Sequence, residues 1–92
     1  MYSIYRTSRY RKDLKIIAYN KKLVDEIGVV VVLLSENDTP LPEKYKDHQL
    51  KGRFAEFREC HVRPNWLLVY KKNKEELILA LIRTGTHAEL FK

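Results

Sequence analysis

Cysteine, glycine and proline are scarce in this 92-residue sequence, which has one cysteine and three each of the other two. The single Cys60 excludes an internal disulfide and suits a reducing compartment. The longest apolar run, Val29 to Leu34, is far shorter than the roughly 20 residues of a membrane-spanning helix. The N-terminus reaches charge at Arg6 without the apolar stretch of a secretory signal. We therefore expect a cytoplasmic protein that makes no membrane contact.

The sequence also lacks the common motifs of metal and nucleotide sites. It has no Cys-x-x-Cys or His-Glu-x-x-His pattern, no glycine-rich phosphate loop and no Gly-x-Ser-x-Gly elbow. Cys60 and His61 are adjacent on an expected strand, so their side chains should point to opposite faces and cannot easily share one zinc ion. We expect no metal and no cofactor.

Composition and charge indicate a folded, basic protein. Hydrophobic residues make up 45% and charged residues 33%, and 92 residues suit a single domain over residues 1–92. The net charge of +6 is uneven: residues 1–22 carry +6, residues 23–45 carry −4, residues 46–74 carry +5 and residues 75–92 carry −1. Two basic stretches make a polyanion a plausible partner, because cations that neutralise phosphates release counterions.

The first half of the chain predicts one strand and two helices. Tyr2 to Arg6 alternate as a short strand, suited to a sheet edge. Thr7 or Ser8 can cap a helix that places apolar residues on one face. A second helical repeat runs from Leu23 to Leu34. Within it, Val29 to Leu34 could instead form a buried strand because β-branched residues favour sheets. We prefer a helix, since the pattern begins at Leu23 and ends before the breaker at residues 37–40.

The second half predicts a loop that carries Tyr45 and His48, then a three-stranded meander. The expected strands are Phe54 to Val62, Trp66 to Lys71 and Leu77 to Arg83. Thr86 and Glu89 have the spacing of a capping box, which predicts a last helical turn to about Phe91. The result is an α+β fold, with two N-terminal helices packed on one face of a mostly antiparallel, twisted sheet of about four strands.

Four residues of the second half have the chemistry of metal-free RNA cleavage. That reaction needs a base for the ribose 2′-hydroxyl, an acid for the leaving 5′-oxygen, and cations around the phosphorane. Histidine suits the first two tasks and arginine the third. The candidates are His48, His61, Arg83 and His87.

Each candidate also has a plainer interpretation. Three histidines in separate segments can be scattered surface residues, and His87 can be incidental to a capping turn. Arg83 at a strand end can pair with Glu59 or Glu89. Trp66 can stack on a base but more often belongs to a core, and Phe91 near an exposed end is the better candidate for base stacking.

Three stretches together resemble one known family. They read LPEKYKDHQLKG over residues 41–52, RECHVRPNWLLVY over residues 58–70 and RTGTHAELF over residues 83–91. In combination they are similar to the YafQ branch of the RelE/ParE superfamily of bacterial toxins, and the likeness in length and element order covers nearly the whole chain.

The resemblance implies a RelE-like fold and an mRNA interferase that cuts messenger in the ribosomal A site, leaving a 2′,3′-cyclic phosphate and a 5′-hydroxyl. It implies His48 as base, His87 as acid, and Arg83 and His61 as stabilisers of the phosphorane. The positions expected to contact substrate are Lys46, Lys51, Arg53, Asn65, Trp66 and Phe91.

The resemblance also implies partners. They are the 70S ribosome, mRNA and a DinJ- or RelB-like antitoxin with an acidic tail laid over the basic stretch from Lys46 to Lys74. Operator DNA is expected only through the antitoxin complex.

One position departs from the family, which has Asp before the tryptophan where this chain has Asn65. An amide can hydrogen-bond but cannot exchange a proton. Two alternatives therefore remain: a non-enzymatic ParE-like toxin that binds DNA gyrase, and an RNA- or ribosome-binding module with impaired catalysis.

Overall fold

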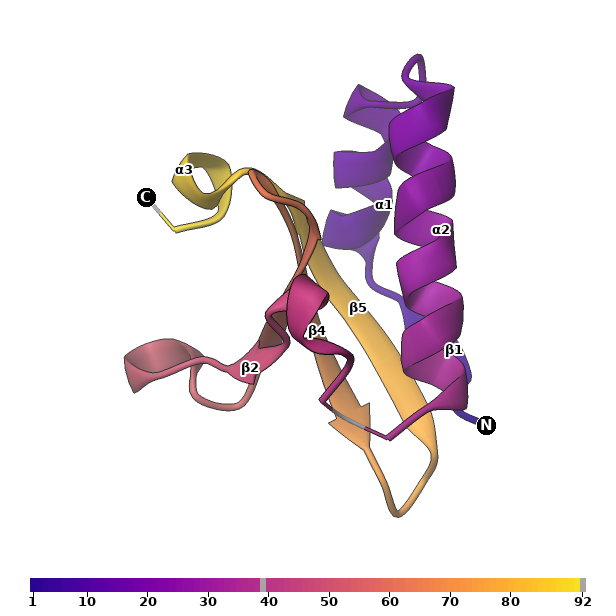
Figure 1. Ribbon diagram of the computed structural model, residues 1–92, viewed down its shortest axis with the longest axis vertical. Coiled ribbons are helices and arrows are strands. Elements are labelled where there is room, and N and C mark those ends of the chain that lie inside the picture. The colour runs from indigo at the N-terminus through magenta and orange to yellow at the C-terminus, as the bar shows by residue number, and fades with distance from the viewer. Residues whose placement is uncertain (39, 92) are drawn as a thin grey trace.

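The computed structural model describes residues 1–38 and 40–91, so Thr39, within the expected breaker, and Lys92 lie outside the described residues. Figure 1 shows the arrangement of the elements. In chain order they are β1 (Ser3–Arg6), α1 (Ser8–Ile16), α2 (Lys21–Glu36), the 3-10 helix η1 (Glu43–Tyr45), β2 (His48–Gln49), the 3-10 helix η2 (Gly52–Phe54), β3 (Arg58–Arg63), β4 (Trp66–Asn73), β5 (Ile78–Gly85) and α3 (His87–Leu90).

Side-chain caps define where the helices begin. The Thr7 hydroxyl accepts from the Tyr10 N–H at the start of α1, and the Asn20 side chain accepts from the Leu23 N–H at the start of α2. The ambiguous segment from Val29 to Leu34 is helical, as expected, because it continues the apolar face of α2. At α3 the expected capping box forms between Thr86 and Glu89.

The sheet is mixed and has the strand order β1-β5-β4-β3-β2. β1 runs parallel to β5 at one edge, and the other pairs are antiparallel. The expected α+β class and edge position of the first strand are confirmed. Within the described part of the chain the sheet has five strands rather than about four, because His48 and Gln49 pair with β3. β3 begins at Arg58 and not at Phe54, since Gly52, at φ +64°, turns the chain into η2.

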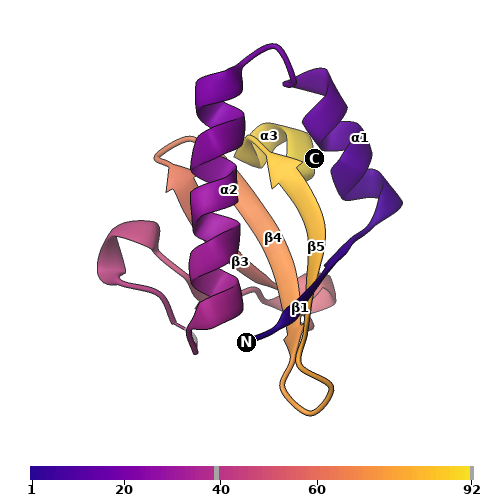
Figure 2. The same cartoon turned by 90° about the vertical axis from the view of Figure 1, so that its right-hand side faces the viewer.

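Both long helices cover one face of the sheet, as Figures 1 and 2 show. Their apolar residues pack on alternate residues of the central strands to form the core. Its fully buried side chains include Ile27, Leu34, Cys60, Leu68, Tyr70, Leu79 and Leu81. On the other side of the sheet lie α3 and the segment that contains β2 and η2 (Figure 1). Within residues 1–38 and 40–91, no helix is both long and apolar enough to span a membrane.

Candidate functional site

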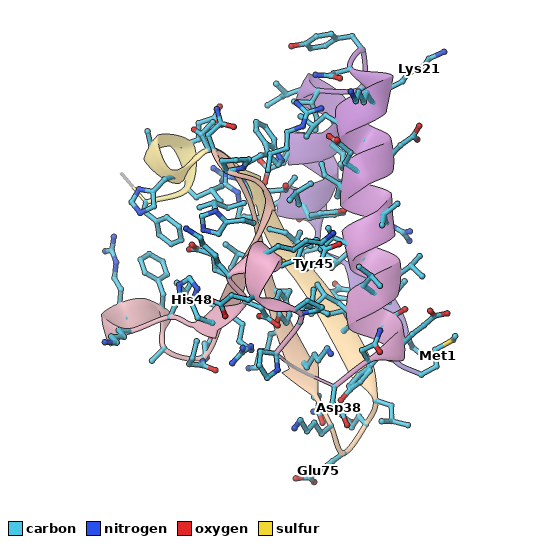
Figure 3. The ribbon with its side chains drawn as sticks, viewed as in Figure 1. Met1, Lys21, Asp38, Tyr45, His48 and Glu75 are labelled. Atoms are coloured by element: carbon cyan, nitrogen blue, oxygen red, sulfur yellow. The ribbon has the colours of Figure 1, made fainter. Side chains whose placement is uncertain are left out.

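Strand register places the candidate residues in two adjacent rows across the sheet. His48 pairs with Glu59, Glu59 with Val69, and Val69 with Arg83. The next row joins His61 to Leu67 and Leu67 to Gly85, and α3 begins two residues later with His87. Because residues opposite one another in antiparallel strands share a face, pairing alone gathers residues from four segments. The rows lie on the face away from α2, where Figure 3 shows His48.

Glu59 lies between two of the histidines. Its Oε1 atom is 3.9 Å from Nε2 of His48 and 3.7 Å from Nε2 of His61, and the residue is only 6% exposed. The Nδ1 atom of His48 lies 2.7 Å from the Lys46 carbonyl oxygen, and that of His61 lies 3.2 Å from the Pro64 carbonyl oxygen. A carbonyl oxygen can only accept, so both Nδ1 atoms carry the proton. In the neutral rings, Nε2 is therefore the basic nitrogen.

A cavity of about 460 Å³ opens beside this pair. The third histidine, His87 at the start of α3, lines this cavity together with His61. The complete lining consists of Glu59, His61, Pro64, Asn65, Leu67, Thr86, His87 and Ala88. His48 and Arg83 lie outside this lining and belong to the site through their row with Glu59.

A buried polar cluster holds the loop that carries His48. The Asp47 side chain has no exposure; it accepts from the Leu41 N–H at 2.9 Å, from the Tyr70 hydroxyl, and from Arg58, whose Nη2 lies 3.2 Å away. Burial would lower the pKa of Arg58, but the Tyr70 hydrogen bond and the Asp47 charge outweigh it and raise that pKa. Burial and the Asp47 hydrogen bond raise the pKa of Tyr70, so it stays a neutral donor.

Arg83 pairs with neither of the glutamates considered from sequence. Its Nε and Nη2 atoms donate to the two oxygens of Asp13 in α1, at 2.8 and 3.2 Å. The expected alternatives, Glu59 and Glu89, were wrong because α1 lies beside the end of β5, a proximity that sequence spacing does not reveal. Glu89 instead accepts from the Thr86 N–H in the capping box.

Aromatic contacts connect α3 to the loop after β2. The Phe91 ring packs edge-on against Phe54 at 5.2 Å and lies 5.1 Å from the His87 ring. The Arg53 guanidinium lies over the Phe54 ring, 5.0 Å from the ring centre. Phe91 is thus adjacent to His87. Lys46 and Lys51 are exposed on the same loop region.

Trp66 lies apart from these residues. Its ring is partly buried against the core, and its indole N–H donates to the Thr84 hydroxyl at 2.8 Å. This placement favours the core interpretation, because the neighbouring core residues Leu68 and Tyr70 share its face of β4. Trp66 supports the strand end that carries Arg83 and does not line the cavity.

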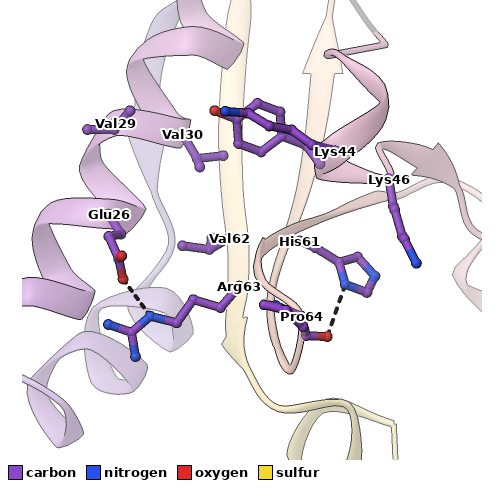
Figure 4. Close-up of a pocket in the computed structure, with 10 residues that line it drawn as sticks. Glu26, Val29, Val30, Lys44, Lys46, His61, Val62, Arg63 and Pro64 are labelled. Atoms are coloured by element: carbon purple, nitrogen blue, oxygen red, sulfur yellow. Dashed lines mark hydrogen bonds and ion pairs between the residues drawn. The ribbon is translucent and has the colours of Figure 1, made fainter.

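A second hollow, of about 420 Å³, lies on the other side of His61 between α2, η1 and β3 (Figure 4). Its rim is polar, formed by Lys44, Lys46 and the half-buried ion pair of Arg63 with Glu26. Its apolar walls are Val29, Val30 and Val62. His61 lines both hollows and turns its Nδ1 atom to Pro64, as Figure 4 shows.

Metal ligands are not grouped in the part of the chain that the structure describes, where no three His, Cys, Asp or Glu side chains meet as a metal ion would require. Cys60 is buried in the core whereas His61 lies on the opposite face, as their adjacency on a strand predicts. Burial also raises the pKa of the Cys60 thiol, which keeps it protonated.

Sequence reasoning missed the positions of two acidic residues at the site. Glu59 entered only as a possible partner of Arg83, although its alternation with His61 on one strand places both on one face. Asp13 was not considered at all. One signal was present: it is the single acidic residue among the first 22, which hold seven Lys and Arg.

The sheet order, the paired helices and the histidine-lined cavity define the class, which is the RelE-like α+β toxin fold. A family model described as the bacterial toxin YafQ of type II toxin–antitoxin systems matches residues 2–92. The chain belongs to the YafQ family.

Individual relatives agree over most of their length. The protein named mRNA interferase toxin YafQ from Escherichia coli K12 is 40% identical over 85 residues, which cover 92% of this chain and 90% of that one. YafQ in the crystal structure of the E. coli DinJ–YafQ complex is 36% identical, with a TM-score of 0.86 and full coverage of both chains. A metal-bound toxin from Helicobacter pylori is 44% identical, with a TM-score of 0.86 over 99% of this chain and 100% of that one.

Proposed function

We propose that this protein is an mRNA interferase that cuts messenger in the A site of the 70S ribosome and so arrests translation. The observation that carries the proposal is the convergence of His48, His61, Arg83 and His87 around two rows of one sheet face. The curated name of the E. coli relative supports the activity. An excess of positive charge, +6 over the chain, suits a partner made of RNA.

The proposed reaction is an internal transfer of the phosphoryl group. His48 takes the proton from the ribose 2′-hydroxyl, and the 2′-oxygen attacks phosphorus. The bond from phosphorus to the 5′-oxygen breaks, and His87 donates a proton to that leaving oxygen. The products are a 2′,3′-cyclic phosphate and a 5′-hydroxyl. Each positioned acid or base contributes about 10²–10⁴-fold.

Two features of the site suit these roles. The Lys46 carbonyl fixes the His48 tautomer so that Nε2 is free to accept a proton, and Glu59 faces the imidazolium that results. Arg83 supplies positive charge to the phosphorane and His61 helps to stabilise it, since preorganised groups are most effective where charge develops. Phe91, against the ring of His87, offers a surface for a base.

A solved relative supports the antitoxin among the proposed partners. YafQ from E. coli is seen in complex with DinJ, and we assign this chain a DinJ-like antitoxin whose acidic segment covers the basic stretch between Lys46 and Lys74. Operator DNA is reached only through that complex. The setting is the bacterial cytoplasm, where messenger and ribosomes are found.

Asn65 lines the cavity in the place of the family's carboxylate. In this chain the cavity lining has a carboxylate at Glu59 and an amide at Asn65. The proposed mechanism therefore includes no proton transfer at position 65. Asn65→Asp tests this point. If a carboxylate at position 65 assists the histidines, cleavage accelerates by about 10-fold or more; an unchanged rate leaves Asn65 as a group that positions RNA.

The test of the function is to express the chain in bacteria and map messenger ends on translating ribosomes. Wild type should produce new 5′-hydroxyl ends in A-site codons, and His87→Ala and Arg83→Ala should not. Lys74→Ala is the control, since that exposed residue lies in the turn after β4, far from α3 (Figure 1). If both site variants arrest growth as strongly as wild type but produce no new 5′-hydroxyl messenger ends, the proposed nuclease activity is refuted. DNA breaks in the arrested cells would then support a toxin that poisons gyrase.

A further inference from the structure

Asp13 completes the edge of β5 at the point where β1 ends. The last paired residue of β1 is Arg6, opposite Leu81, and the chain then turns into α1. Beyond that point, among residues 1–38 and 40–91, β5 has no neighbouring strand on this side, yet Thr84 is only 2% exposed. A buried backbone N–H needs an acceptor. Asp13 supplies it, because its Oδ2 atom accepts from the Thr84 N–H at 3.0 Å.

The same carboxylate binds Arg83 by one edge of its guanidinium. Asp13 accepts from Nε and Nη2, and the pair is bidentate. Arginine has five N–H donors, so three remain, and two of these, one on each terminal nitrogen, point along the outer edge of the guanidinium. That edge is the fork that matches two oxygens of a phosphate. The Arg83 side chain is 24% exposed and that of Asp13 is 9% exposed, so Arg83 is accessible to a ligand while Asp13 is nearly buried.

From this geometry we infer that Asp13 is a positioning residue of the active site, which holds Arg83 with its outer edge turned to the scissile phosphate. The inference rests on the proposed function. Through Thr84, Asp13 also fixes the strand end from which the chain turns into α3 and His87. A residue of the first helix thus sets the orientation of two groups that lie about 70 positions later.

A purely structural role for Asp13 would give a different result in a double-mutant cycle. The cycle compares wild type, Asp13→Asn, Arg83→Ala and the double variant in single-turnover cleavage on programmed ribosomes. We expect Arg83→Ala to slow the cleavage step by about 100-fold, as for other preorganised donors of a transition state. Asp13→Asn, which keeps an acceptor for Thr84 but loses the charge, should slow it by about 10-fold with little change in half-saturating ribosome concentration. In the Arg83→Ala background Asp13→Asn should have less than about a 2-fold effect, because its target is gone.

Thr7→Ala is the matched control for attachment of α1. The Thr7 hydroxyl joins α1 to β5 by donating to the carbonyl oxygens of Leu81 and Ile82, at 2.8 and 3.2 Å. The hydrogen bonds of the Arg83 side chain go to Asp13 instead. Thr7→Ala should lower the melting temperature about as much as Asp13→Asn and leave the cleavage rate within about 2-fold. Asp13→Glu, which keeps the charge, should recover part of the rate that Asp13→Asn loses.

A readout without catalysis separates this inference from the proposed function. The Nε–H proton of Arg83 should give a slowly exchanging NMR signal in wild type and in Thr7→Ala, and the signal should disappear in Asp13→Asn. If wild type cuts no messenger, the proposed function fails, whatever that signal shows. If wild type cuts messenger, a full 10-fold effect of Asp13→Asn in the Arg83→Ala background overturns the inference, as does wild-type cleavage by Asp13→Asn.

Discussion

Removal of the Asp47 side chain should destabilise the protein more than removal of any exposed ion-pair partner. Asp47→Ala takes the acceptor from Arg58, Tyr70 and the Leu41 N–H at once. Breaking a buried pair by removing one partner costs about 3–5 kcal/mol. Arg58 is 21% exposed, so water can partly solvate it and the lower end of that range applies to the pair. The unpaired hydroxyl and N–H add roughly 1 kcal/mol or more.

The expected loss of about 4 kcal/mol is large for a chain of this length. At roughly 0.05–0.15 kcal/mol per residue, the total free energy of unfolding of a 92-residue domain is about 5–14 kcal/mol. Each kcal/mol shifts the melting temperature of such a domain by roughly 4–8 °C, so the midpoint should fall by at least about 15 °C. Cleavage should fall as well, because the next residue is His48 and its loop is held mainly by this cluster.

Urea denaturation followed by Trp66 fluorescence measures the effect, and Glu26→Ala provides the control. The Glu26 pair with Arg63 is 38% and 33% exposed, and such a pair contributes at most about 1 kcal/mol. In an Arg58→Met background the cost of Asp47→Ala should shrink, since no buried charge is left unpaired. Equal destabilisation by Asp47→Ala and Glu26→Ala would refute the reasoning.

Three further predictions concern glycine conformation, alkaline stability and the buried carboxylate. Gly28→Ala, on the exposed side of α2, should stabilise the protein by about 0.5–1 kcal/mol in the same denaturation assay. Gly52→Ala, at φ +64°, should destabilise it by about 1 kcal/mol. Changes of the same sign for the two variants would contradict the argument from backbone conformation. Burial raises the pKa of Tyr10 to about 12, above its value of 10.0 in the unfolded chain, so its contribution is complete below pH 10 and lost as the pH rises towards 12. Tyr10→Phe should therefore lose less stability than wild type over that interval, and parallel pH curves would count against it. Glu59→Gln should keep the fold and slow cleavage by about 10-fold or more, and a wild-type rate would remove Glu59 from the mechanism.

Local patterns were sufficient for most elements of the fold. The helical period from Leu23 identified α2 through its valine-rich segment, and the capping box at Thr86 identified α3. The two-residue strand β2 was missed because two residues have no period to recognise. The parallel pairing of β1 with β5 was also beyond sequence reasoning, since it joins segments about 75 residues apart and depends on packing rather than on a turn.

The candidate site shows the same division. Histidine and arginine chemistry, together with the family resemblance, selected His48, His61, Arg83 and His87. Their supports were not selected. Asp13 acts on Arg83 across 70 positions, and Asp47 acts on Tyr70 across 23. A carboxylate that binds a distant partner looks from sequence like any surface acid, so only the tertiary structure distinguishes Asp13 and Asp47 from exposed acids such as Asp25.

One irregularity in the sheet explains how Arg83 comes to share a row with His48. From Asn73 back to Tyr70, β4 pairs with β5 in constant register, and Tyr70 lies opposite Leu81. The preceding residue of β4, Val69, lies opposite Arg83 rather than Ile82, so Ile82 is an extra residue in β5. Without that bulge, Val69 would pair with Ile82, and Arg83 would fall opposite Leu68, whose row continues to the fully buried Cys60. A shift of one residue exchanges the two faces of a strand. The bulge therefore places Arg83 in the row of Glu59 and His48 and not in the buried row of Leu68 and Cys60. Bulges beside active sites commonly redirect a side chain in this way.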